Sequence, residues 1–101
     1  MMNIRNGDFN IMDLNDFRNN IDEIDDKIVK LLLERFAVAE NIAEYKKQHN
    51  LEIFQKGREA EVLKKIAYKT NGINNGEYKD YILKIYSGII DASKSFQYTI
   101  I

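Results

Sequence analysis

The stretch that decides the fold is LNDFRNNIDEIDDKIVKLLLERFAVAENIAEYKKQ, residues 14–48. Its apolar side chains recur at alternating steps of three and four, which predicts one long helix packed against another helix. At about 1.5 Å per residue this helix extends roughly 50 Å, so it must bend back as a hairpin or lie along a second subunit. We call the periodic positions the seam: Leu14, Phe17, Ile21, Ile24, Ile28, Leu31, Arg35, Val38, Ile42 and Tyr45.

The sequence before the seam differs from the rest of the chain. Residues 1–12 show no period and are expected to form a flexible N-terminal tail, followed by a single domain over residues 13–98. Asp13, with Asp16 three residues later, predicts the N-cap of the long helix. After that helix, residues 49–56 interrupt the apolar pattern and predict a loop.

Two shorter helices are expected after this loop. The second helix begins near Lys56 and stops at Asn71, where the following glycine is a common helix terminator. Asn74 and Glu77 then resemble a capping box, which places a third helix from about Glu77 to Tyr98. No segment alternates as a strand does, so the predicted fold is all-α with a long, a short and a medium helix. One side of the third helix carries Tyr78, Ile82, Ile85, Ile89, Ser93 and Gln97.

Composition excludes several classes of function. The chain has 101 residues and no cysteine, so disulfides and thiolate metal sites are absent, and the single His49 cannot build a zinc site alone. A net charge of -1 gives no general attraction to nucleic acid or anionic membrane. No apolar run approaches the roughly 20 residues of a membrane span. The N-terminus lacks the apolar core of a signal peptide, so a cytoplasmic protein is expected.

Arg35 is the one seam position that is not apolar. A buried guanidinium needs a partner or water, so Arg35 either pairs with a carboxylate such as Asp25 or Glu34, reaches solvent, or holds an anionic ligand. Lys46 follows eleven residues later, so on a helix both side chains point the same way, about 16 Å apart. Together they would grip a small dianion; the alternative for Lys46 is a solvated lysine.

Arg18 lies 28 residues before Lys46, which is about 42 Å on a straight helix. The two residues therefore cannot serve one site within a chain. They can do so if two long helices lie antiparallel in a two-fold dimer, so that each site takes Arg18 from the neighbouring chain. The alternative is an ordinary surface arginine in the first turn.

The later helices carry polar residues of the same kind. Arg58 and Glu59 open the second helix, whose N-terminal amides favour anions, although they would also suit a surface capping pair. Ser93 and Gln97 continue the apolar stripe of the third helix, where a simple hydrogen-bonded pair is the alternative. No nucleophile–base pair or glycine-rich phosphate loop accompanies them. Such a set suits a small dicarboxylate and chemistry that needs only positioning and electrostatics.

Four segments in this order resemble the all-helical (type II) chorismate mutases over residues 13–97. They are Leu14 to Asp25 with Arg18, Leu31 to Lys46 with Arg35, Gly57 to Leu63 with Arg58 and Glu59, and Ile89 to Gln97 with Ser93. The resemblance implies an intertwined helical homodimer that rearranges chorismate to prephenate in phenylalanine and tyrosine biosynthesis. It implies no cofactor, no metal, no nucleic acid and no membrane.

The resemblance also implies a role for each residue. The arginines and Ser93 would hold the two carboxylates of chorismate, with Arg18 supplied in trans. Glu59 would hold the substrate hydroxyl, and Lys46 and Gln97 would donate to the ether oxygen. The catalytic residues would be Lys46, Gln97 and Arg35.

Gln55 stands where this family often has an aspartate near the substrate hydroxyl. If only the backbone amide of Gln55 is needed, little is lost; if the side chain contributes, affinity or rate suffers. Two rival functions remain: an isochorismate pyruvate-lyase, and a non-catalytic regulatory module that binds prephenate or a partner enzyme. Docking to another shikimate-pathway enzyme is a further expectation.

Overall fold

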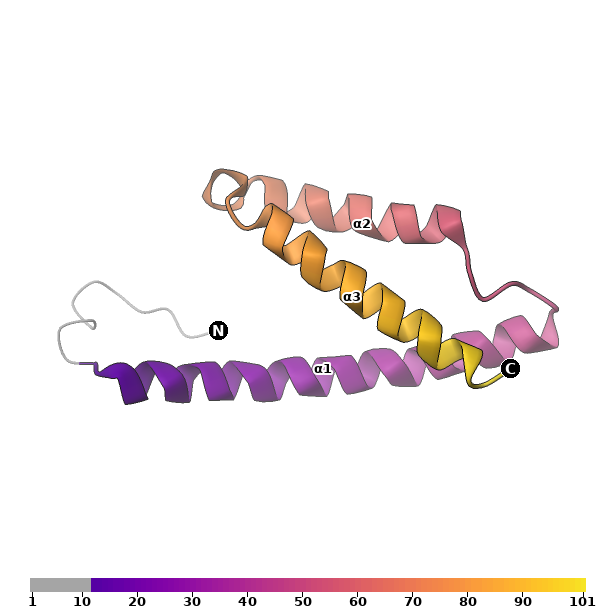
Figure 1. The fold of residues 1–101 in the computed structure, drawn as a ribbon, viewed down its shortest axis with the longest axis horizontal. Coiled ribbons are helices and arrows are strands. Elements are labelled where there is room, and N and C mark those ends of the chain that lie inside the picture. The colour runs from indigo at the N-terminus through magenta and orange to yellow at the C-terminus, as the bar shows by residue number, and fades with distance from the viewer. Residues whose placement is uncertain (1–11) are drawn as a thin grey trace. The chain divides into compact units, whose positions relative to one another are not determined.

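The computed structural model describes residues 12–101, and all of its regular structure is helical (Figure 1). The elements are α1 (Leu14–Gln48), α2 (Lys56–Asn71), the 3₁₀-helix η2 (Ile73–Gly76) and α3 (Lys79–Tyr98). The expected tail, residues 1–12, lies almost wholly outside the described residues. The predicted bounds of the first two helices are confirmed, because both their apolar period and their stop signals are local to the sequence.

A reciprocal pair of hydrogen bonds starts α1. The backbone N–H of Asp16 donates to Asp13 Oδ1 at 2.9 Å, and the N–H of Asp13 donates to Asp16 Oδ2 at 3.0 Å. Each carboxylate thus satisfies a backbone donor that has no partner within the helix. The predicted N-cap at Asp13 is confirmed.

The chain divides into two compact units, Met1–Arg35 and Phe36–Ile101, and α1 contributes to both. The second unit contains the end of α1 together with the hairpin of α2 and α3. Figure 1 shows α3 returning in the opposite direction to α2, with the two helices diverging away from the turn that joins them. The ring of Phe36 on α1 meets the ring of Phe96 on α3 edge to face, with centroids 5.3 Å apart.

The start of α3 differs from the prediction. The helix begins at Lys79 rather than Glu77, and no side chain caps it. The expected capping box is wrong because Asn74, Asn75 and Gly76 all adopt positive φ, which turns the chain at the point where a helix was expected. The N–H of Glu77 instead donates to the carbonyl of Asn74 at 3.1 Å.

The buried residues of the described chain all lie in the second unit. Four are apolar and two are polar: Ala39, Ala43, Ile53, Ile90, Ser93 and Gln97. On α1 the inward face of this unit therefore follows the two alanines, one position along from the seam. Among residues 12–101, no large side chain is fully buried. An interior this small contributes little stability by itself.

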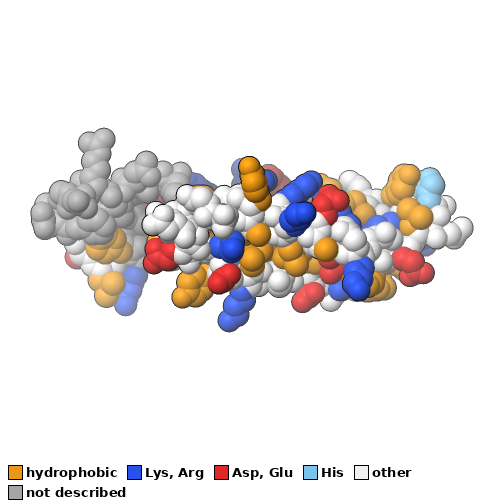
Figure 2. Space-filling view, turned by 90° about the horizontal axis from the view of Figure 1, so that it is seen from above, with side chains coloured by type: hydrophobic (Ala, Val, Ile, Leu, Met, Phe, Trp, Pro, Cys, Tyr) orange, Lys and Arg blue, Asp and Glu red, His pale blue; other side chains and the backbone are white. Residues whose placement is uncertain are grey.

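The seam predicted from the sequence is largely open in the single chain. Seven of its nine apolar residues are exposed: Leu14, Ile21, Ile28, Leu31, Val38, Ile42 and Tyr45. Figure 2 shows apolar side chains at the surface among lysine, arginine and carboxylate side chains. In the predicted stripe of the third helix, Tyr78, which is the N-cap of α3, and Ile85 are exposed too. No helix within residues 12–101 has the length and apolar character that crossing a bilayer requires.

Candidate functional site

The ammonium group of Lys46 is held where α1 ends. The chain leaves the helix through Asn50 in the left-handed conformation (φ 54°). The N–H of Leu51 returns to the carbonyl of Lys46 at 2.8 Å, and the N–H of Asn50 reaches the carbonyl of Lys47 at 3.4 Å. This pair of bonds is a Schellman motif, and it directs the following residues back along the helix end.

The returning loop supplies the partner of Lys46. Lys46 Nζ donates to the carbonyl oxygen of the buried Ile53 at 3.0 Å, across seven residues of sequence. Burial lowers the pKa of Lys46, and attraction to the carboxylate of Glu59 offsets only part of this effect. Lys46 is therefore a half-buried, partly dehydrated donor, unlike the solvated lysine that the sequence also allowed.

Glu59, in the first turn of α2, is held by a lysine of α3. Lys94 Nζ lies 3.4 Å from both Glu59 Oε1 and Glu59 Oε2. The same ammonium group lies 4.7 Å from the centroid of the Phe54 ring and 4.0 Å from Asp91 Oδ1. Both Lys94 and Glu59 are mostly shielded, with 30% and 24% of their side chains exposed. One carboxylate thus lies within the influence of two ammonium groups, those of Lys94 and Lys46.

Ser93 and Gln97 form the buried polar pair of α3. Gln97 Nε2 donates to Ser93 Oγ at 3.3 Å, and both residues are buried as the sequence predicts. Within the described part of the chain, Gln97 Oε1 is buried without a hydrogen-bond partner. Buried polar atoms in proteins are nearly always satisfied, so this amide is a place where a ligand or water is expected.

Gln55 and Arg58 lie near this group in sequence but point elsewhere. Gln55 is the N-cap of α2, yet its side chain donates to the carbonyl of Glu52 at 2.8 Å and caps no helix amide. Arg58 is exposed and pairs with Glu61 one turn along. Hydrogen bonds from Lys65 and from Arg58 lower the pKa of Glu61. Among the described residues, the partners of these two side chains are therefore Glu52 and Glu61 rather than Glu59.

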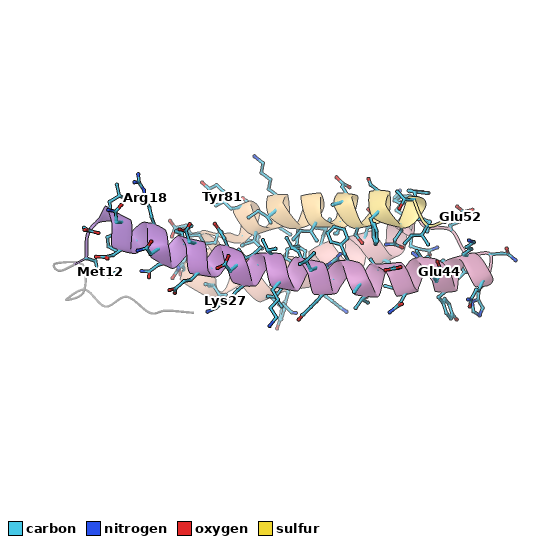
Figure 3. The ribbon with its side chains drawn as sticks, turned by 90° about the horizontal axis from the view of Figure 1, so that it is seen from below. Met12, Arg18, Lys27, Glu44, Glu52 and Tyr81 are labelled. Carbon is cyan, nitrogen blue, oxygen red and sulfur yellow. The ribbon has the colours of Figure 1, made fainter. Side chains whose placement is uncertain are left out.

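Arg18 and Arg35 belong to the first unit. Arg18 is exposed, and Figure 3 shows its side chain projecting outward from the N-terminal part of α1. Arg35 is half-buried. Among residues 12–101, no carboxylate lies within 4.0 Å of Arg35, so neither of the proposed pairings with Asp25 or Glu34 is present. Both arginines are left available for an anion.

Sequence reasoning missed Lys94 and Phe54. A signal for Lys94 was present, because Ile90, Ser93, Lys94 and Gln97 follow the i, i+3, i+4, i+7 pattern of one helix face. Phe54 gave no such signal, since it lies in the loop before α2. In the second unit, two ammonium groups thus act on one carboxylate, and a buried hydroxyl–amide pair lies on the same helix as Lys94. In the described residues, no group of histidine, cysteine or carboxylate side chains is placed to hold a metal ion.

Comparisons with known proteins agree on one family. Residues 17–98 match the family model described as chorismate mutase type II. The chain is 34% identical over 84 residues to a chorismate mutase of Methanocaldococcus jannaschii, covering 83% of each chain. It is 35% identical over 86 residues to a bifunctional chorismate mutase/prephenate dehydratase of Aquifex aeolicus.

The extent of the two matches differs. The match to the bifunctional relative covers 84% of this chain but only 24% of that protein, so the chain spans about a quarter of its length. No solved structure matches the chain significantly.

Proposed function

Because the chain belongs to the type II chorismate mutase family, we propose that it is an isomerase that rearranges chorismate to prephenate. The observation that carries this proposal is the state of Lys46. Its ammonium group is half-buried, partly dehydrated and anchored on a backbone carbonyl, so it is oriented before substrate arrives. A donor that needs no reorganisation during the reaction is the most effective kind.

The rearrangement moves no proton and forms no covalent intermediate, so the protein supplies positioning and charge. In the proposed mechanism, binding the compact diaxial form of chorismate removes conformational freedom in advance. Lys46 and Gln97 donate to the ether oxygen, where negative charge grows as the C–O bond breaks. The Gln97 amide has two N–H donors, so one can keep its bond to Ser93 Oγ while the other donates to the ether oxygen, and the Ser93 hydroxyl proton stays available for a substrate carboxylate.

The remaining residues bind the substrate's polar groups. The guanidinium groups of Arg18, Arg35 and Arg58 and the hydroxyl of Ser93 hold the two carboxylates, and Glu59 accepts the substrate hydroxyl. The availability of Arg18 and Arg35 supports these roles. Arg58 must exchange Glu61 for substrate; since that ion pair is exposed, the exchange costs little. Gln55 contributes through its backbone, because its side chain is turned to Glu52.

We further propose that the domain of residues 13–98 works as a homodimer with Arg18 supplied in trans. The open seam supports this assembly, since a row of exposed apolar side chains on one helix favours a partner surface. Arg18 and Lys46 are 28 positions apart on the continuous helix α1, which favours their meeting across two chains.

The proposed activity is tested by following the loss of chorismate absorbance with purified protein. Lys46→Ala should lower the rate by at least about a hundredfold, as expected for the loss of one preorganised donor. Lys47→Ala, the neighbouring exposed lysine, is the matched control and should retain turnover. A Lys46→Ala variant with near-normal turnover would remove the basis of the mechanism.

The shared site has its own test. Neither Arg18→Ala nor Lys46→Ala alone should turn over chorismate well. Mixing them should restore one intact site per heterodimer after subunit exchange. Heterodimers that form without recovered turnover would show that the two residues serve different sites.

Other functions and partners are separated by further assays. Nothing in the comparisons favours an isochorismate pyruvate-lyase or a non-catalytic regulatory module over a chorismate mutase. An assay with isochorismate as the substrate distinguishes a pyruvate-lyase from a chorismate mutase. The name of the bifunctional relative makes a prephenate dehydratase the first docking partner to test by copurification. Biosynthesis of this kind leads us to propose the cytoplasm as the location.

A further inference from the structure

Lys94 lies between residues that come from three separate parts of the second unit. It follows Ser93 on α3, its ammonium group contacts both carboxylate oxygens of Glu59 on α2, and it lies over the Phe54 ring in the loop before α2. The proposed mechanism uses Glu59 and Ser93 but has no use for Lys94. A shielded cation that binds a site carboxylate bidentately must affect how that carboxylate behaves.

The ammonium groups of Lys46 and Lys94 both contact the loop before α2. The loop offers Lys46 the carbonyl of Ile53 and offers Lys94 the adjoining ring of Phe54. Both ammonium groups attract Glu59, but only Lys94 lies within 4.0 Å of its carboxylate among the described residues. Glu59 therefore pairs with Lys94, and within residues 12–101 the direct hydrogen-bond partner of Lys46 Nζ is the backbone carbonyl of Ile53.

We propose that Lys94 is a positioning residue, which holds the Glu59 carboxylate on the α3 side and so leaves the Lys46 ammonium group free for substrate. The expected effect of Lys94 on turnover rests on the proposed function. Without Lys94, Glu59 keeps its electrostatic attraction to the Lys46 ammonium group. A direct pair between them would occupy the donor that the ether oxygen needs, and substrate would have to break that pair to bind productively.

The pairing also predicts how Lys46 titrates. The charged groups around it are Glu59 from α2 and, through Glu59, Lys94 and Asp91 from α3. Removing Lys94 removes a like charge and brings Glu59 closer, and both changes favour the ammonium form. The pKa of Lys46 should therefore rise in a Lys94→Met variant, and the alkaline limb of turnover should move to higher pH with it.

Lys65 provides a matched control. Its ammonium group lies 3.4 Å from Glu61 Oε1, so Lys65→Met removes the same charge from a lysine–glutamate pair of the same length on an exposed surface. In the full chain we expect Lys94→Met to lower kcat/KM about tenfold or more, as for a misplaced catalytic group, and Lys65→Met to stay near wild type. Lys94→Arg should restore most of the loss, and Lys94→Gln should behave as Lys94→Met.

Two measurements together test the positioning role of Lys94. One is kcat and KM across the alkaline range, and the other is the titration of the Lys46 side chain by NMR in protein without substrate. Equal behaviour of Lys94→Met and Lys65→Met in the NMR titration overturns the proposal, even if the wild-type chain turns over no chorismate. A raised Lys46 pKa with unchanged turnover in an active enzyme also overturns the positioning role. Absent wild-type turnover with a raised Lys46 pKa would refute the proposed function and leave the pairing of Glu59 supported.

Discussion

Replacing Leu31 by aspartate should separate the proposed dimer, whereas the same replacement at Leu33 should not. Both leucines lie on α1 and are similarly exposed in the single chain, at 61% and 64%. They point about 200° apart around the helix, and only Leu31 belongs to the seam. The two variants make the same change of charge and the same loss of helix propensity, so a difference between them reports the seam alone.

The expected weakening of the dimer follows from the exposed fraction of Leu31. Burying a whole leucine side chain is worth about 1.5–3 kcal/mol, so covering the exposed 61% contributes about 1–2 kcal/mol per copy. A two-fold dimer holds two copies, so their loss weakens the dimer by about 2–4 kcal/mol, or roughly 30-fold to several hundredfold in its dissociation constant. The buried carboxylates would weaken it further.

Sedimentation velocity over a dilution series measures this directly. Leu31→Asp should dissociate at concentrations where wild type and Leu33→Asp remain paired, and its turnover per subunit should fall on dilution. Circular dichroism at high concentration checks that the helices persist. If both variants dissociate equally, or neither does, the seam is not the surface through which two chains meet.

Three further outcomes are expected. Turnover should fall as pH rises through the pKa of Lys46, because only the ammonium form donates. Since burial lowers this pKa, the fall should come below the pH at which an ordinary lysine titrates. A rate that stays level up to the ordinary lysine range would contradict this role. Asn50→Ala should lower the free energy of unfolding by about 1 kcal/mol, since alanine disfavours the left-handed conformation, while Asn50→Gly should not; urea denaturation compares them. Gln55→Asp should raise the unfolding free energy by about 0.5–1 kcal/mol, because aspartate can cap an amide in the first turn of α2 that the Gln55 side chain leaves uncapped, and a lower urea midpoint would refute this.

The sequence predicts the helices well where their signals are local. The bounds of α1 and α2 follow from their apolar period, a capping pair at Asp13 and the stop at Asn71. The start of α3 lies two residues after the predicted Glu77, and the predicted capping box is wrong, because Asn74 and Asn75 act through their backbone conformation rather than as caps. The inward face of α1 was also missed, since Ala39 and Ala43 are too small to stand out beside a row of leucines and isoleucines.

The candidate site, too, is predictable from the sequence only in part. The burial of Ser93 and Gln97 follows from polar residues continuing an apolar stripe, and the sequence predicts it. The pairing of Lys94 with Glu59 joins residues 35 positions apart, so no periodicity within one helix reveals it. The anchoring of Lys46 on a carbonyl is also hidden, because every residue has a carbonyl and only the fold selects one.

The bond from Lys46 to Ile53 has an evolutionary consequence. The acceptor is the main-chain oxygen of Ile53, which every amino acid carries. A substitution at position 53 therefore leaves the acceptor in place, whereas a substitution can remove a side-chain carboxylate or hydroxyl. What the lineage must conserve is the spacing between Asn50 and Lys56, which returns that oxygen to the lysine. For this bond, homologues should therefore reject insertions and deletions within the loop more strongly than a substitution at position 53 that keeps an apolar side chain.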